Sequence, residues 1–198
     1  MPQAAGARAA VAKRMRKNRE RQPIPRRDWK AVFKRRRKAR GASAFQLRIV
    51  EDSIRAPVTR YEKHWYKGCA KWQLPSGPLP PAYLDFLSWS NGGEFWNDRR
   101  GFQFIPTSEL REMLLCHFVP KYMPGALPFA LDGGGHFYLF DMRRPPVKRE
   151  YPILFAGCGD LGYEDAIVVA KSFVTLCKGN TDFIDRYLEW VVRPEEER

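Results

Sequence analysis

The sequence predicts an α+β domain in which a central, mostly antiparallel sheet of four to six strands is flanked by N-terminal and C-terminal helices. Two glycine-rich turns, at 91–93 and 133–135, and the alternating apolar residues around the second turn predict the strands. Apolar residues at helical spacing, before the first turn and near the C-terminus, predict the flanking helices. A chain of 198 residues is long enough for one such domain plus an extension.

The N-terminal segment differs from the rest of the chain in charge. Residues 1–40 contain 16 Lys or Arg against two acidic residues, a net charge of +14, so the whole of the chain's net charge of +13 comes from this segment. So few apolar side chains cannot offset the entropy cost of ordering the backbone. We therefore predict a basic, disordered tail over 1–44, a folded domain over 45–192 and a short charged tail over 193–198.

The basic tail has two interpretations. Its cationic runs over residues 8–40 are typical of an arm that binds nucleic acid by neutralising phosphates. The alternative is a solvated tail without a function of its own, or a gene start assigned too far upstream. The sequence does not distinguish them.

The first helices are predicted before the first glycine turn. Residues 59–72 are rich in aromatic side chains, and Tyr61 and Trp65 fall on one helical face. A second helix begins at Pro81, because a proline in the first turn loses no hydrogen bond. Its apolar face faces the core, and we expect Asp85 to be solvated.

The first turn follows this helix at Asn91, Gly92 and Gly93. Asn and Gly tolerate positive φ and can end a helix in the left-handed conformation, which we expect at Gly92. The chain then leaves as a strand from Glu94. Another strand is predicted at residues 102–105, followed by a helix after Pro106.

The second turn joins two strands through Asp132, Gly133, Gly134, Gly135 and His136. Asp-Gly is a favoured hairpin turn, and we expect positive φ at Gly134. Further strands are predicted at 151–155 and 166–170. We expect two C-terminal helices, capped by Ser172 and Thr181.

This order of short motifs carries a resemblance. A Pro-Ala-Tyr-Leu-Asp-Phe-Leu helix, an Asn-Gly-Gly turn, a Pro-Phe-Ala-Leu-Asp-Gly-Gly-Gly hairpin and a Ser-Phe helix start follow one another. Over roughly residues 57–190 the chain resembles the SUKH superfamily (SMI1/KNR4-like domains). Bacterial members are mostly immunity proteins that neutralise protein toxins, often nucleases. The resemblance implies a non-enzymatic binding module whose partner is a cognate toxin.

The resemblance also implies where a partner would bind, in a groove beside the central sheet. Large aromatic side chains there would anchor the partner, and acidic ones would select a basic surface. For each candidate a structural role is the alternative: Trp96 in the core, for example, or Asp132 in the turn. The candidates are Glu94, Trp96, Asp132, His136, Tyr163, Glu164 and Asp165, and the structural turn residues are Asn91, Gly92, Gly93, Gly133, Gly134 and Gly135.

No motif in the sequence predicts catalysis, a metal site or a cofactor. The three histidines and four cysteines lack the paired spacing of zinc ligands. Cys116 and His117 are adjacent in a predicted helix and should point apart. Cys158 lies between two glycines near Asp160, which leaves an enzyme that uses this thiol and nearby acids as a further hypothesis.

The expected location is the cytoplasm. The sequence has no run of about 18 apolar residues and no N-terminal apolar segment typical of a secretory signal. Its cysteines are too widely spread to indicate a disulfide framework. The sequence does not predict an oligomeric state, and a nucleic-acid-associated interaction protein remains the alternative function.

Overall fold

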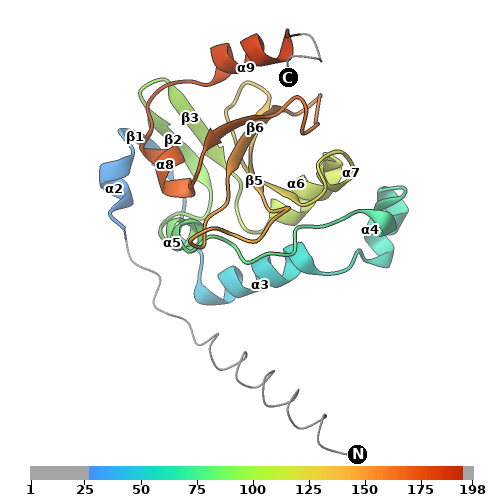
Figure 1. Ribbon diagram of the computed structural model, residues 1–198. Coiled ribbons are helices and arrows are strands. Elements are labelled where there is room, and N and C mark those ends of the chain that lie inside the picture. The colour runs from blue at the N-terminus through green and yellow to red at the C-terminus, as the bar shows by residue number, and fades with distance from the viewer. Residues whose placement is uncertain (1–26, 194–198) are drawn as a thin grey trace, which may run out of the picture.

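The computed structural model describes residues 27–193, with a sheet at its centre and helices around it (Figure 1). Residues 1–26 of the predicted N-terminal tail and residues 194–198 of the predicted C-terminal tail lie outside the described part. The helices are α2 (Trp29–Val32), α3 (Ala44–Arg55), α4 (Arg60–Trp65), the 3-10 helix η1 (Cys69–Lys71), α5 (Pro81–Trp89), α6 (Leu110–Cys116), α7 (Val119–Tyr122), α8 (Phe173–Lys178) and α9 (Ile184–Val191).

The sheet is an antiparallel meander in which the order of the strands in space is their order in the sequence. The α+β class is therefore confirmed. Residues 27–193 contain seven strands, more than the four to six expected, because the first lies in the segment predicted to be disordered. The strands are β1 (Arg35–Lys38), β2 (Gly93–Asn97), β3 (Arg100–Phe104), β4 (Ala126–Leu131), β5 (His136–Asp141), β6 (Ile153–Gly157) and β7 (Ile167–Ala170).

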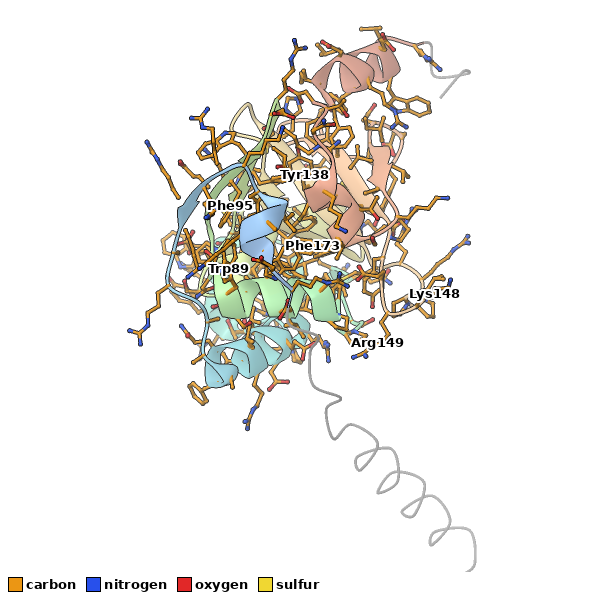
Figure 2. All side chains as sticks on the ribbon, turned by 90° about the vertical axis from the view of Figure 1, so that its left-hand side faces the viewer. Trp89, Phe95, Tyr138, Lys148, Arg149 and Phe173 are labelled. Atoms are coloured by element: carbon orange, nitrogen blue, oxygen red, sulfur yellow. The ribbon has the colours of Figure 1, made fainter. Side chains whose placement is uncertain are left out.

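Phenylalanine rings fill the space between one face of the sheet and the helices α5 and α8 (Figure 2). The ring of Phe86 in α5 lies 4.3 Å from that of Phe104 in β3 and 5.6 Å from that of Phe173 in α8. Phe95 and Phe129 join the cluster from β2 and β4. All five rings are buried, so this aromatic layer ties the early and late parts of the chain to one sheet.

Residues 27–44 belong to the folded domain, so the predicted boundary at residue 44 is wrong for this stretch. Trp29 and Phe33 are only 1% and 2% exposed and pack in the aromatic core. The indole N–H of Trp29 donates to Asp85 Oδ2 at 2.9 Å, and the backbone N–H of Arg27 donates to the same oxygen at 3.0 Å. Asp85 is therefore buried rather than solvated as expected, because this N-terminal segment covers it.

The N-terminal segment continues as the edge strand β1, in which Arg35 pairs with Trp96 and Lys38 with Gly93 of β2. Gly93 has a φ of +112°, and a Cβ built on it would lie 2.5 Å from the carbonyl oxygen of Arg37. Glycine at this position thus permits the close approach of β1 to β2. All four β1 side chains are basic and exposed, a composition that discourages further strands from pairing with this edge.

The two glycine turns differ from expectation in one position. Gly92 has positive φ, +89°, as predicted. Gly134 does not, so that prediction is wrong; the left-handed residues of the second turn are Gly133 and Gly135, at +86° and +97°. The backbone N–H of Gly134 instead donates to Asp132 Oδ1 at 2.7 Å, which holds the centre of the loop in an ordinary conformation.

The caps of the last two helices were predicted with mixed success. Ser172 caps α8 as expected, since its Oγ accepts from the backbone N–H of Thr175 at 3.2 Å. The expected cap of α9 by Thr181 is wrong: Asp182 Oδ1 accepts from the backbone N–H groups of residues 183 and 184. Thr181 uses its carbonyl instead to accept from Arg100 Nε of β3 at 2.8 Å, which joins the segment before α9 to the sheet.

Candidate partner-binding surface

The β4–β5 hairpin is closed by a hydrogen bond between two of the predicted residues. Asp132 Oδ2 lies 2.8 Å from His136 Nδ1, and both side chains are only about 15% exposed. The His136 ring stacks on Phe155 of β6 at 4.9 Å and meets the edge of Tyr187 of α9 at 5.1 Å. Asp132 thus builds the turn, as the structural interpretation predicts, and His136 attaches the hairpin to the C-terminal helix.

Glu94 and Trp96 lie on the face of β2 opposite the buried Phe95. Both face basic residues of β1: Glu94 Oε2 lies 3.5 Å from Arg37 Nη1, and the Arg35 guanidinium lies 5.2 Å from the Trp96 ring. Trp96 is partly buried, so it is neither a core residue nor a freely exposed anchor.

Trp96 also borders the hairpin. A Cβ built on Gly101 of β3 would lie 3.2 Å from Trp96 Nε1 and 3.5 Å from the carbonyl oxygen of Asp132, so both residues flank this glycine. The structure therefore brings three predicted residues together at one end of the sheet. We call Trp96, Asp132 and His136 the hairpin-end group.

Three further candidates lie in the β6–β7 loop, and the first of them, Tyr163, lies away from the hairpin-end group. The hydroxyl of Tyr163 donates to the carbonyl oxygen of Pro124 at 2.9 Å, and the Arg143 guanidinium lies 3.5 Å from its ring. Burial raises the pKa of Tyr163 to about 12, so the hydroxyl stays protonated. Pro124 precedes β4, at the opposite end of that strand from the hairpin. Tyr163 is therefore not part of the hairpin-end group.

Glu164 and Asp165 follow in the same loop, just before β7. The indole N–H of Trp190 in α9 donates to the carbonyl oxygen of Glu164 at 3.0 Å, so the C-terminal helix fixes the backbone of the loop. The side chain of Glu164 remains exposed and that of Asp165 is half-buried.

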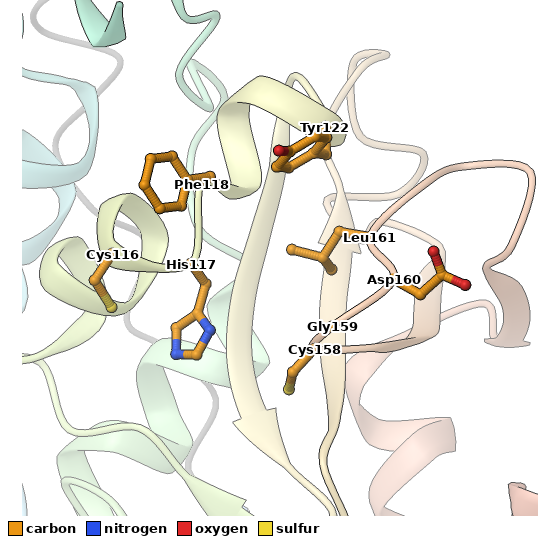
Figure 3. Close-up of a pocket in the computed structure, with 8 residues that line it drawn as sticks. All are labelled: Cys116, His117, Phe118, Tyr122, Cys158, Gly159, Asp160 and Leu161. Carbon is orange, nitrogen blue, oxygen red and sulfur yellow. The ribbon is translucent and has the colours of Figure 1, made fainter. Parts of the chain in front are cut away.

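A pocket of about 370 Å³ opens between the α6–α7 corner and the start of the β6–β7 loop (Figure 3). It brings together residues that the sequence analysis treated separately, because only the fold places the two segments side by side. No spacing pattern in the sequence signals it. Its lining residues are Cys116, His117, Phe118, Tyr122, Cys158, Gly159, Asp160 and Leu161.

The thiols of Cys116 and Cys158 are held in the protonated form. Burial raises the pKa of Cys158 to about 11 and also raises the pKa of Cys116, so both are protonated at neutral pH. The thiolate is the form that acts as nucleophile or metal ligand. The His117 ring packs edge-on against Phe137 at 4.9 Å. Across residues 27–193, no three His, Cys, Asp or Glu side chains are grouped as metal ligands. The pocket is better suited to receive a side chain than to perform thiol chemistry.

The part of the chain that forms the sheet, the hairpin and the glycine turns matches a known protein family. The model of the SMI1/KNR4 family (SUKH-1) matches residues 70–178, more than half of the chain. The chain belongs to the SMI1/KNR4 family (SUKH-1). The resemblance that the sequence motifs carried is thereby confirmed. No curated protein matches the sequence.

The SUKH-1 match divides the structure into a shared and an added part. The matched residues contain α5, strands β2 to β7 and α8, together with the pocket and all seven predicted partner-binding residues. The elements α2, β1, α3 and α4 precede the match, and α9 follows it. Within residues 27–193, no helix is both long and apolar enough to cross a membrane.

Proposed function

We propose that this SUKH-1 protein is an immunity protein that neutralises a cognate protein toxin by non-covalent occlusion. The observation that carries the proposal is the family match over residues 70–178, since bacterial members of the superfamily mostly have this role. A nuclease is the toxin class that we favour. The protein would act in the cytoplasm and without a cofactor.

Binding rather than chemistry is supported by the state of the pocket. An enzyme built on Cys158 would need a lowered thiol pKa, whereas burial raises this pKa to about 11. A pocket with protonated thiols beside the sheet can instead receive one side chain of a partner, as a hot-spot pocket does.

The toxin-facing surface that we propose comprises the hairpin-end group, Glu94 and the loop residues Tyr163, Glu164 and Asp165. The exposed carboxylate of Glu164 would attract a basic partner, and Trp96 would supply apolar contact area. Nuclease active sites are usually positive, so the basic strand β1 beside Trp96 would oppose such a partner. We therefore expect the toxin to approach from the β6–β7 loop and to leave β1 outside the interface.

The test is co-expression of the full chain with a toxin encoded next to its gene. Cells that make the toxin should survive only when this protein is present, and the purified proteins should form a stable complex that lacks toxin activity. Trp96→Ala and Glu164→Lys should each weaken the complex, by ~1–4 kcal/mol for a hot-spot residue.

Asp52→Lys is the matched control, because Asp52 is an exposed acid of α3 that lies away from the proposed surface. This variant should protect like the wild type. Absence of protection against every neighbouring toxin would refute the immunity function. Protection that survives both surface substitutions would refute the proposed interface.

A second function is supported by β1. Its four exposed basic side chains extend the basic N-terminal segment onto a rigid edge strand, which favours association with nucleic acid. The affinity of the full chain for single-stranded and duplex oligonucleotides, measured from ~50 to ~200 mM salt, tests this. Phosphate-driven binding should weaken by ~10³–10⁵ if six to ten phosphates are neutralised. Binding that is absent, or insensitive to salt, would exclude it.

A further inference from the structure

Helix α4 is held on the body of the protein although it contributes no buried residue to the core. Two of its six residues are large aromatic side chains directed to solvent: Tyr61 is 73% exposed and Trp65 is 61% exposed. A short helix with no buried face gains little from packing, since most helical stability in proteins comes from a buried apolar face. Polar contacts must therefore keep it in place.

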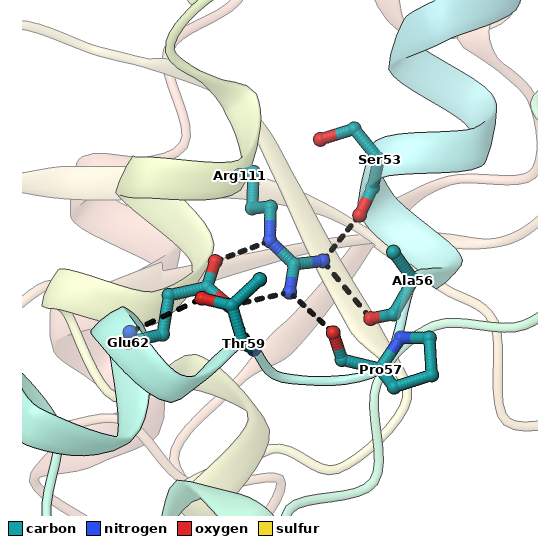
Figure 4. Close-up of polar contacts among 6 residues, drawn as sticks. All are labelled: Ser53, Ala56, Pro57, Thr59, Glu62 and Arg111. Atoms are coloured by element: carbon teal, nitrogen blue, oxygen red, sulfur yellow. Dashed lines mark hydrogen bonds and ion pairs between the residues drawn. The ribbon is translucent and has the colours of Figure 1, made fainter.

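Those contacts converge on Arg111 of α6 (Figure 4). Its guanidinium forms a two-fold ion pair with Glu62 of α4, with Nη2 2.9 Å from Glu62 Oε2, and donates to the carbonyl oxygens of Ser53 and Ala56 at the end of α3. Glu62 also accepts from the backbone N–H of Thr59 at 2.7 Å in a capping box. The Arg111 hydrogen bonds are the main cause that lowers the pKa of Glu62 to about 2. These contacts of Arg111 fix α4 against α3 and α6 and hold the exposed aromatic side chains of α4 in position.

The exposed rings of α4 continue into a larger aromatic area. Tyr66, directly after α4, and Trp72, after η1, both contact the ring of Phe118, at 6.3 and 5.5 Å. Phe118 in turn forms part of the wall of the pocket beside α6. We call Tyr61, Trp65, Tyr66, Trp72 and Phe118 the α4 aromatic surface.

The charge around this surface is positive. Four basic residues on α4 and next to it are exposed: Arg60, Lys63, Lys67 and Lys71. No carboxylate of residues 27–193 forms an ion pair with them. Of the nearby acidic residues, Glu62 is neutralised by Arg111, and the exposed Glu112 of α6, which acts on Tyr66, is outnumbered by the four cations. Tyr and Trp are typical of hot spots, and the unpaired cations around them favour an acidic partner by charge complementarity.

We propose that the α4 aromatic surface binds an acidic polypeptide segment that carries aromatic residues. The geometry of the rings favours a polypeptide over single-stranded nucleic acid. Tyr61, His64 and Trp65 pack edge to face, at 60° and 90°, whereas bases need open ring faces on which to stack. Aromatic side chains of a partner can pack edge to face against such rings, and a helix already fixed by Arg111 reduces the entropy cost of binding.

This surface is distinct from the one proposed for the toxin. It is centred on α4, which precedes the SUKH-1 match, it contains none of the seven candidate residues, and it meets the pocket at Phe118 alone among its five residues. The charge that it selects is also opposite, because a basic toxin would be repelled here. The inference therefore does not depend on the immunity function, and either can fail without the other.

The test uses the full chain and a labelled random copolymer of glutamate and tyrosine, with polyglutamate and oligo(dT) as comparison probes. The chain should bind the glutamate–tyrosine copolymer more tightly than polyglutamate of equal length, because only the former has rings that pack against the aromatic side chains of α4. The double variant Tyr61→Ala/Trp65→Ala should weaken copolymer binding about tenfold or more, the size of a hot-spot loss. Lys63→Glu/Lys67→Glu should weaken binding of both acidic polymers.

Two matched controls separate this surface from general exposure and charge. Phe45→Ala/Ile49→Ala removes apolar side chains exposed to a similar degree on α3, and Lys171→Glu/Lys178→Glu makes the same charge change elsewhere. Both should bind the copolymer within twofold of the wild type, and all variants should melt as the wild type does. Equal binding of the two acidic polymers, or copolymer binding that survives Tyr61→Ala/Trp65→Ala, would overturn the proposal. A larger loss for oligo(dT) than for the copolymer would do the same and would assign the surface to nucleic acid.

Discussion

Deleting residues 27–42 is expected to remove most of the stability of the domain, whereas a chain that starts at residue 27 should fold like the full chain. The first deletion takes away Trp29 and Phe33, which are 1% and 2% exposed in the aromatic core. It also removes β1, which covers the edge of β2.

The expected magnitude follows from these contacts. Replacing one buried Trp or Phe by Ala costs ~3–5 kcal/mol. The deletion also removes the hydrogen bond from the Trp29 indole to Asp85, but it uncovers that carboxylate, so this pair adds less than the two rings do. A typical domain has ~5–15 kcal/mol of stability in total, so losing both rings approaches or exceeds the whole.

Urea unfolding followed by far-UV circular dichroism measures this for chains that begin at residues 1, 27 and 43. The Trp29→Phe variant isolates the indole N–H, because the ring stays largely apolar while the donor to Asp85 is lost; we expect a loss of ~1.5–3 kcal/mol. If the chain that begins at residue 43 unfolds within ~1 kcal/mol of the chain that begins at residue 27, the N-terminal segment does not stabilise the core and the reasoning is refuted.

Gly92→Val should destabilise the domain by ~1–3 kcal/mol in thermal unfolding, because φ is +89° there; wild-type behaviour would contradict this. Glu62→Gln should cost up to ~3 kcal/mol at neutral pH. The pKa of Glu62 is lowered from 4.5 to about 2, so its stabilisation is complete above about 4.5, fades as the pH falls through about 2, and should leave mutant and wild type equally stable below that. A gap that is constant with pH would exclude the charged pair with Arg111 as its source. The thiol of Cys158 should react with an aromatic disulfide at a rate that rises about tenfold per pH unit from 8 to 10, with Cys158→Ser as control, because its pKa is about 11. A rate that levels off below pH 8 would show an activated thiolate instead.

The elements predicted well are those whose signals lie within a few residues. Pro81 starts α5, Ser172 caps α8, and the glycines at 133–135 turn between β4 and β5. Each of these depends on backbone conformation or on a cap three residues away, which a local pattern records. Trp29 and Phe33 are four residues apart, which is the spacing of one helical face, but the many charges around them favour the prediction of a disordered segment.

What could not be predicted depends on contacts between distant residues. Asp85 is buried because its partner Trp29 lies 56 residues earlier, and nothing in the helix itself indicates this. The pocket forms where the end of α6, with Cys116, meets the loop after β6, with Cys158, and these two segments lie far apart in the sequence. The candidate residues likewise separate into the hairpin-end group, Glu94 on β2 and the β6–β7 loop. Alternation along a strand predicts the face on which a residue lies but not which loops fold toward that face.

The order of the strands has a consequence for how the chain matures during synthesis. Each strand from β3 to β7 pairs with the strand made just before it, so it finds its partner soon after it is made. β1 is the exception: Arg35 pairs with Trp96, 61 residues later. At ~5–20 residues per second, translation leaves the first strand and its two buried rings without a partner for roughly 3–12 s. The charges of the Arg-Arg-Arg-Lys sequence of β1 therefore have a role before folding as well as after it. They keep the unpaired strand in solution until β2 has been made.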